Sequence, residues 1–261
     1  PRALRRLIAP HIDLGLGADA HAGARAALQA GGRPDVAVVL GVCHGPSEER
    51  FIACRKDFAT PLGTLPHDAG LLDRLERRLG RDPTRGQLVH RSEHSVEFQA
   101  LWLAHLWPDD PPAIVPFLVG SFEEFVRGGR RPAEDPEVTA FCEALRETVA
   151  EDGREVVVVA SVDLAHVGPR YGDPEGLDET GEARLEAQDR GVLDRIVAGD
   201  AGGFFDEIAR SRNANRHCGV APIYVVLELG EGAGRLVRYG QGRIDPPTGS
   251  VVSFAAVAFE R

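Results

Sequence analysis

The chain has 261 residues, of which 43% are hydrophobic and 27% charged, a composition typical of a globular protein with a substantial core. Its formal net charge of -10, from 40 acidic and 30 basic residues, argues against a nucleic-acid partner, which needs a basic surface. No apolar run approaches the roughly 20 residues of a membrane-spanning helix, and the chain shows no signal-peptide pattern, so we expect no membrane partner.

Cysteine usage indicates the compartment. The four cysteines form no CxxC pair and no zinc-finger spacing, which predicts a reducing, cytoplasmic location. The chain begins at Pro1 and contains no methionine, so we expect it to be trimmed or to be a segment of a longer protein. The sequence is compatible with a homo-oligomer.

The first half of the chain alternates between strand and helix patterns. In order, we expect a strand at 5–10, an Ala-rich helix at 19–31, a strand at 35–41, an irregular loop with short strands at 45–66, a helix that His67 and Asp68 open, a helix at 95–106 and a buried strand at 113–119.

The second half begins with a polar stretch, 122–135, which reads as a surface loop. There follow a helix at 136–151, a strand at 154–162, helices at 181–198 and 200–211, an apolar run at 219–229 that fits a helix or a strand, and an antiparallel hairpin at 234–244 and 250–259.

This alternation predicts one α/β domain over residues 1–261. Strand–helix alternation is typical of a mostly parallel central sheet with helices on both faces, here with a C-terminal antiparallel hairpin. No internal repeat or convincing domain boundary interrupts the pattern.

Three of the predicted strands lead into a histidine, namely His11, His44 and His166, and Asp163 stands three residues before the last of these. The carboxyl ends of parallel strands share one edge of a sheet, where open α/β sheets bind ligands. One such histidine alone is more often structural than functional. Three at equivalent positions favour a common site, because neutral imidazole is both the commonest metal ligand and a general base near neutral pH.

Two further motifs carry chemistry. Glu93-His94-Ser95-Val96-Glu97 fits either the capped start of a helix or a segment that turns His94 into the same pocket. Cys218, before Gly219 and the apolar run, offers a thiol that could serve as a nucleophile or a metal ligand. His217 should face away from Cys218, because adjacent side chains of an extended segment point to opposite sides.

Together, His11, His44 and Cys218 would form a site of two imidazoles and one thiolate. Such a site leaves coordination positions open, which suits non-haem Fe(II), with Cu or Zn as alternatives. Asp163 and His166 would then orient a ligand and move protons.

The chain resembles the Memo family, known in bacteria and archaea as AmmeMemoRadiSam system protein B. The resemblance rests on six motifs in family order: Ala9-Pro-His11, Leu40-Gly-Val-Cys-His44, Glu93-His-Ser-Val-Glu97, Ser161-Val-Asp-Leu-Ala-His-Val-Gly168, Cys218-Gly-Val-Ala-Pro-Ile223 and Gly249-Ser-Val-Val-Ser-Phe-Ala-Ala256.

The resemblance implies a fold similar to class III extradiol dioxygenases, which use non-haem Fe(II). It implies that His11, His44 and Cys218 are the metal ligands and that Asp163 and His166 line the pocket. We add His94 as a catalytic candidate. We expect the metal to be Fe(II), with Cu or Zn as alternatives. A small-molecule substrate or O2 would bind at the metal. The thiolate replaces the dioxygenase Glu and makes ring cleavage doubtful.

The chain departs from the family pattern around the site. Ile12-Asp13-Leu14 stands where the family has Ala-Gly-Tyr, Cys43 stands in place of a Ser, and Gly45 in place of a second His. The ligand set is retained, whereas the neighbouring residues that would set ligand preference differ.

Three functions compete. The first is a metal-dependent oxidoreductase with dioxygenase-like chemistry. The second is a non-catalytic module that binds an anion or a peptide in the cleft, with Arg170 and Arg216 as candidate partners. The third, ranked last, is a cysteine hydrolase built on Cys218, His166 and Asp163.

Overall fold

The computed structural model describes residues 4–260 and confirms the predicted α/β class. In chain order the strands are β1 (Leu4–Ala9), β2 (Val36–Val42), β3 (Phe51–Ala53), β4 (Phe58–Thr60), β5 (Gly63–Leu65), β6 (Ala113–Val119), β7 (Val156–Ser161), β8 (His166–Val167), β9 (Arg235–Asp245) and β10 (Ser250–Glu260). The α-helices are α1 (Ala18–Ala30), α2 (Ala69–Leu79), α3 (Glu97–Leu106), α4 (Glu123–Gly128), α5 (Pro136–Ala150), α6 (Glu179–Ala198), α7 (Ala201–Arg210) and α8 (Val220–Glu228).

The central sheet is mixed, with the order β3-β6-β2-β7-β1-β10-β8, and β9 pairs with β10. Four neighbouring strands, β6, β2, β7 and β1, run parallel. The strands β3, β8, β9 and β10 pair antiparallel with their neighbours, and β9 and β10 form the expected C-terminal hairpin. β4 and β5 form a separate two-stranded hairpin.

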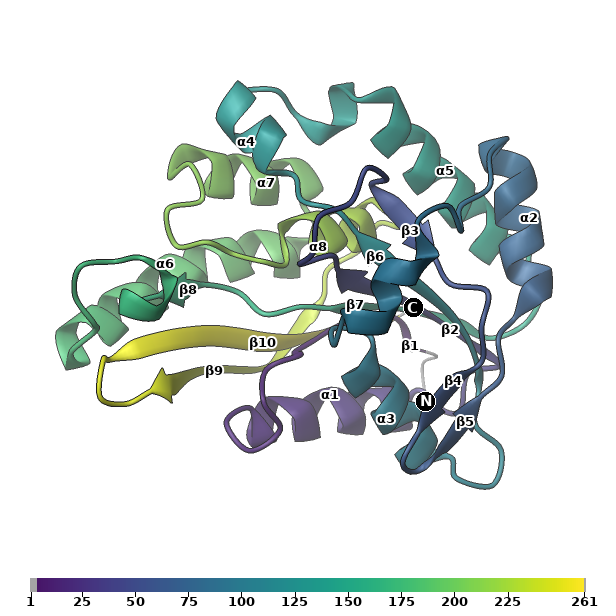
Figure 1. Ribbon diagram of the computed structural model, residues 1–261, viewed down its shortest axis with the longest axis horizontal. Coiled ribbons are helices and arrows are strands. Elements are labelled where there is room, and N and C mark those ends of the chain that lie inside the picture. The colour runs from purple at the N-terminus through teal and green to yellow at the C-terminus, as the bar shows by residue number, and fades with distance from the viewer. Residues whose placement is uncertain (1–3, 261) are drawn as a thin grey trace.

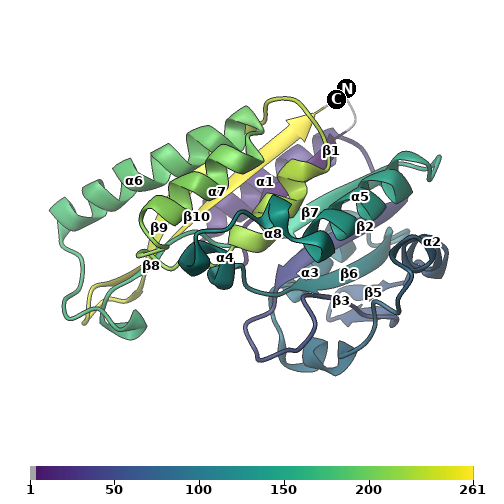
Figure 2. The ribbon, with the colours of Figure 1, turned by 90° about the horizontal axis from the view of Figure 1, so that it is seen from above.

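Helices cover both faces of the sheet, as Figures 1 and 2 show. Alternate residues of each strand point to opposite faces, which divides the core into two layers. One layer packs the sheet against α2, α5, α6, α7 and α8, and the other packs it against α1 and α3. All seven residues of β2 are buried, which explains its continuous apolar sequence.

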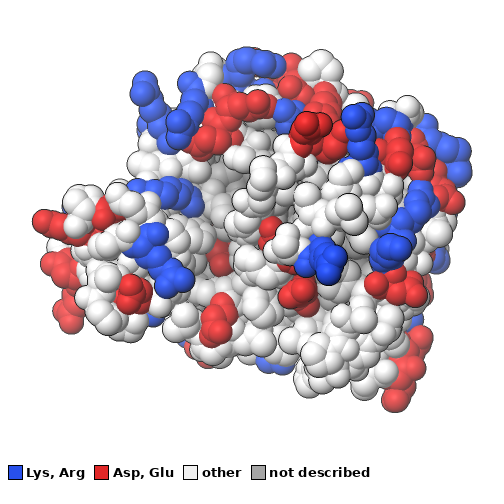
Figure 3. All heavy atoms as spheres, in the orientation of Figure 1, with Lys and Arg blue, Asp and Glu red and all other residues white. Residues whose placement is uncertain are grey.

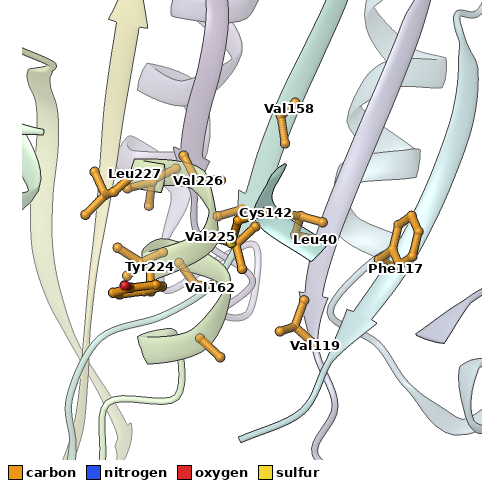
Figure 4. Close-up of a cluster of buried hydrophobic side chains, with 14 of the residues drawn as sticks. Leu40, Phe117, Val119, Cys142, Val158, Val162, Tyr224, Val225, Val226 and Leu227 are labelled. Atoms are coloured by element: carbon orange, nitrogen blue, oxygen red, sulfur yellow. The ribbon is translucent and has the colours of Figure 1, made fainter. Parts of the chain in front are cut away.

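The ambiguous run at 219–229 forms helix α8. Its side chains from Val220 to Leu227 are all buried, and those of Tyr224, Val225, Val226 and Leu227 pack into the larger core layer (Figure 4). Pro222 lies in the first turn of α8, where a missing N–H breaks no helical hydrogen bond.

The prediction of a surface loop at 122–135 is wrong in part. Residues Glu123–Gly128 form α4, and Phe125 and Val126 on this helix are buried. The sequence did not indicate this helix because it has only six residues, of which two are buried, too few to show a helical period.

None of the helices among residues 4–260 combines the length and the apolar character needed to cross a bilayer. On the face drawn in Figure 3, basic and acidic side chains alternate along the rim while the centre is largely uncharged. This face therefore presents no continuous basic patch.

Candidate metal centre

The site begins with the register of three neighbouring parallel strands. His11, His44 and Asp163 each stand two residues after the last residue of β1, β2 and β7. Because β7 lies between β1 and β2, these three side chains reach the same edge of the sheet. Cys218 arrives from the opposite direction, immediately before Gly219, the N-cap of α8.

The donor atoms of His11, His44 and Cys218 all lie within 4.8 Å of one another. Cys218 Sγ is 3.7 Å from His11 Nε2. The structure thus brings together, from three distant parts of the chain, the three residues that the sequence grouped as metal ligands.

Each histidine of this group is oriented through its Nδ1 atom. His11 Nδ1 lies 3.0 Å from the carbonyl oxygen of Ser161, which can only accept, so Nδ1 carries the proton. His44 Nδ1 lies 3.0 Å from a carboxylate oxygen of Glu93. In the His11 ring Nε2 therefore keeps its lone pair, and in both rings the contact at Nδ1 fixes the orientation, as in metal-ligating histidines whose other nitrogen is hydrogen-bonded.

Glu93 is a site residue whose role the sequence did not reveal. Its carboxylate accepts from the backbone N–H groups of His44 (2.9 Å), His94 (2.9 Å) and Ser95 (3.1 Å), besides the His44 ring. Burial acts to raise the pKa of Glu93, but hydrogen bonds from His44 and His94 outweigh it and hold the pKa well below its usual range.

The capping interpretation of residues 93–97 does not describe this segment. Helix α3 starts with no side-chain cap, and Ser95 Oγ instead donates to the carbonyl of Val42 at the end of β2. The Glu-His-Ser spacing therefore ties the start of α3 to the strand that carries His44. The sequence shows only a Glu four residues before the first residue of α3, a pattern that a helix cap shares.

His94 lies at the open side of the site. Its ring is 5.1 Å from the ring of His44, stacked on it, and 5.2 Å from the ring of His11. The side chain is about half exposed, at 53%. A hydrogen bond to Glu93 raises the pKa of His94, so this imidazole holds a proton more tightly than a free one.

Asp163 is buried beneath the site. Its Oδ1 accepts from the backbone N–H groups of His11 and Ile12, both at 3.1 Å, and Oδ2 is 3.6 Å from His11 Nε2. Burial raises the pKa of Asp163 to about 6. Burial also lowers the pKa of His11 to about 3, helped by the charges of His44 and His94, so His11 is neutral at physiological pH.

His166 is placed differently from the other two strand-end histidines. Its Nδ1 bonds the carbonyl of Leu164 at 3.1 Å, and its ring meets Tyr171 edge-on at 5.0 Å. Burial lowers its pKa. Within residues 4–260, His166 belongs to neither of the two groups of clustered donor atoms, which are His11, His44, Cys218 and His44, Glu93, His94.

Two rival interpretations lose support here. A cysteine hydrolase needs a bond between Cys218 and His166, and the described residues contain none: Cys218 Sγ contacts His11 and the carbonyl of Asp163. Arg216, a candidate anion partner, already pairs with Asp173 and donates to the carbonyl of His166.

A cavity of about 120 Å³ adjoins the group, with His44 and Cys218 in its wall. Its other walls include Phe122, Val126 and His217. A larger cavity, about 290 Å³, lies between Arg6, Arg146 and Phe259 and contains no candidate ligand in its lining. The smaller cavity is relevant to the site because His44 and Cys218 line it.

Comparison with known proteins supports a relationship over the whole chain. A family model described as Memo-like protein matches residues 1–258. Among curated relatives, a MEMO1 family protein of Aquifex aeolicus is 27% identical over 98% of this chain and 63% of its own length. One of Thermus thermophilus is 32% identical over 75% and 54%, and one of Methanopyrus kandleri 28% identical over 100% and 85%. The chain thus spans less than two thirds of the two bacterial relatives.

Proposed function

The chain belongs to the Memo family, and from this premise we propose that it binds one metal ion through His11, His44 and Cys218. The observation that carries the proposal is the convergence of these three donor atoms within 4.8 Å, with the Nδ1 atom of each histidine held by another group. A histidine with only a structural role has no need of a second ring nitrogen directed at a thiol, as His11 Nε2 is directed at Cys218 Sγ.

The donor set selects among metals. Two imidazoles and one thiolate suit Fe(II), Cu or Zn and disfavour Mg²⁺ and Ca²⁺, which prefer oxygen. Three protein ligands leave coordination positions open, as in catalytic rather than structural sites. Fe(II) is our first expectation, with Cu or Zn as alternatives.

The proposed activity is that of a non-haem, dioxygenase-like oxidoreductase acting on a small molecule, with O2 as a candidate co-substrate. When bound, the metal would supply Lewis acidity or redox chemistry at its open positions. His94 would hold a proton at the open side of the site, and Asp163, with its pKa of about 6, would accept or return one near neutral pH. His166 is the third candidate for proton transfer.

The cysteines bear on the location. All four are free, which fits a reducing compartment, so we propose that the protein works in the cytoplasm.

The decisive experiment is elemental analysis of the purified protein, together with anaerobic titration with Fe(II) and Cu(I). We expect about one metal per chain, bound with high affinity, and loss of binding in His44→Ala and in Cys218→Ala. Cys142→Ala is the matched control, because Cys142 is buried in the core on α5 and absent from both donor groups.

Retention of metal by both site variants would refute the ligand assignment. No uptake of either metal by the wild type would favour the non-catalytic module, and chelator-independent binding of an anion or a peptide would support it.

A further inference from the structure

A second polar cluster lies behind the site and has no role in the chemistry above. Asp189, in the middle of α6, is completely buried. Its Oδ2 accepts from the hydroxyl of Tyr239 on β9 at 2.8 Å, and its Oδ1 lies 3.2 Å from His217 Nε2. A buried carboxylate is costly unless it is bonded, so this contact fixes the His217 ring against α6.

His217 is held on its backbone as well. Its N–H donates to Asn213 Oδ1 at 2.8 Å, and its carbonyl accepts from Asn213 Nδ2 at 3.3 Å. The segment that these bonds close is strained: Arg212, Asn213 and Arg216 have φ of 51°, 51° and 53°. Among residues 4–260 they are the only non-glycine residues with positive φ, and such strain persists only where the surroundings enforce it.

Cys218 is anchored on its other side too. A Cβ on Gly219 would come within 2.7 Å of Val162 Cβ and 2.8 Å of the carbonyl oxygen of Asp163, so the chain here presses directly on the end of β7. The Cys218 N–H donates to the carbonyl of Leu164 at 3.3 Å. The two neighbours of Cys218 in the chain, His217 and Gly219, are therefore both held in place. Cys218 Sγ lies 3.7 Å from His11 Nε2.

We infer that Asp189 is a positioning residue for Cys218, acting through the side chain of His217 to hold the sulfur at the metal-binding position. The inference rests on the proposed function insofar as the sulfur binds a metal. The position of the sulfur is a property of the chain without metal. The His217 ring contacts Asp189 on α6, and this contact lets it anchor the backbone next to Cys218.

The test uses Co(II), whose bond to a thiolate gives a charge-transfer absorption. We expect His217→Leu, which cannot donate to Asp189, to lose Co(II) affinity by about 10–100-fold, the usual cost of removing an outer partner of a ligand. The charge-transfer band should weaken with it. His217→Gln keeps a donor and should restore both. Asp189→Asn, which preserves volume, is the milder variant and should fall between wild type and His217→Leu.

Asp68→Asn is the matched control. Asp68 is also buried, but it bonds Leu71 and Arg154 at the start of α2, away from the site. A role confined to stability predicts that Asp68→Asn and Asp189→Asn lower the melting temperature and leave the Co(II) band intact. An unchanged band and affinity in Asp189→Asn and in His217→Leu, or in whichever of them folds, would overturn the inference.

A metal-free readout separates this inference from the proposed function. Alkylation of Cys218 by iodoacetamide, followed by peptide mass spectrometry, should be severalfold faster in His217→Leu than in wild type or His217→Gln. If wild type takes up no Co(II) but the alkylation rates differ in this way, the metal proposal fails and the positioning role stands. Equal rates overturn the positioning role.

Discussion

Glu93 shows how one carboxylate can organise a site that it does not itself fill. It receives three backbone N–H groups and the ring of His44, so its acceptor capacity is used within the protein. It therefore fixes the orientation of the His44 ring.

Glu93→Gln tests this role. An amide cannot accept all four bonds, so we expect metal affinity to fall about 10–100-fold, measured by competition against a chelator of known affinity. Glu97→Gln, an exposed change in the first turn of α3, should leave the affinity unchanged. Equal affinities for the two variants would remove Glu93 from the site.

The pH dependence of metal binding follows from two pKa shifts. His11, with its pKa lowered to about 3, is already neutral at pH 6–8 and has no proton to release. Burial, reinforced by Asp163, raises the pKa of the Cys218 thiol, so the metal must displace its proton. The thiolate is the proposed ligand, so metal binding should strengthen as pH rises.

We therefore expect about one proton released per metal ion and a tenfold gain in affinity per pH unit over about pH 6–8. Titrations at several pH values check the slope, and Cys218→Ser should abolish it. A pH-independent affinity in the wild type would mean that the sulfur is not a ligand.

The sequence predicted His11 and His44 as neighbours because both follow strands whose ends share an edge of the sheet, and it added Cys218 as a thiol at the entrance to the apolar run. It could not predict the role of Glu93, whose partner His44 is 49 residues earlier in the chain. A Glu shortly before a helix has the same local pattern whether it caps the helix or binds a distant ring. The role of Asp189 could not be predicted either, because its partners, His217 and Tyr239, are also distant in the sequence.

At the scale of elements, the approach of α8 to the end of β7 places the sulfur. Its apolar sequence left helix and strand equally open, because a segment buried on all sides has no periodicity to read. The structure forms a helix there, and the missing side chain of Gly219 permits its close contact with Val162 and Asp163 at the end of β7.

Gly219→Ala should therefore damage both packing and binding. Its new Cβ would overlap Val162 and Asp163, so we expect the free energy of unfolding to fall by about 1–3 kcal/mol in urea titrations, together with weaker metal binding.

Gly128→Ala on α4 is the contrasting change. Nothing lies within 4 Å of its Cβ position, so we expect unchanged stability or a gain of up to about 1 kcal/mol. If both alanine variants behaved alike, crowding at Gly219 would not be the cause.

At the scale of the whole molecule, the candidate ligands come from segments that span most of the chain. A ligand that joins them should stabilise the folded state as a unit. At a free metal concentration 100 times the Kd, the gain is about 2.7 kcal/mol.

For a chain of this size that gain corresponds to a rise of about 5–10 °C in melting temperature, measured by calorimetry with and without metal. The rise should disappear in Cys218→Ala and persist in Cys142→Ala. An equal rise in Cys218→Ala would place the stabilising ion elsewhere.

The sequence predicted the long strands, most of the helices and the C-terminal hairpin, because these depend on local periodicity. It did not predict where the hairpin joins the sheet. β10 pairs with β1 at the side opposite β7, a long-range choice that no local pattern encodes.

That position has a consequence for the nascent chain. β1 is made before both of its neighbours in the sheet, β10 and β7, the second of which supplies the Ser161 carbonyl to His11. Until Cys218 has also been made, the growing chain carries His11 and His44 without the thiol of the proposed site. The proposed metal site can therefore be complete only after residue 218 has been made, and a product truncated before Cys218 should bind no metal there.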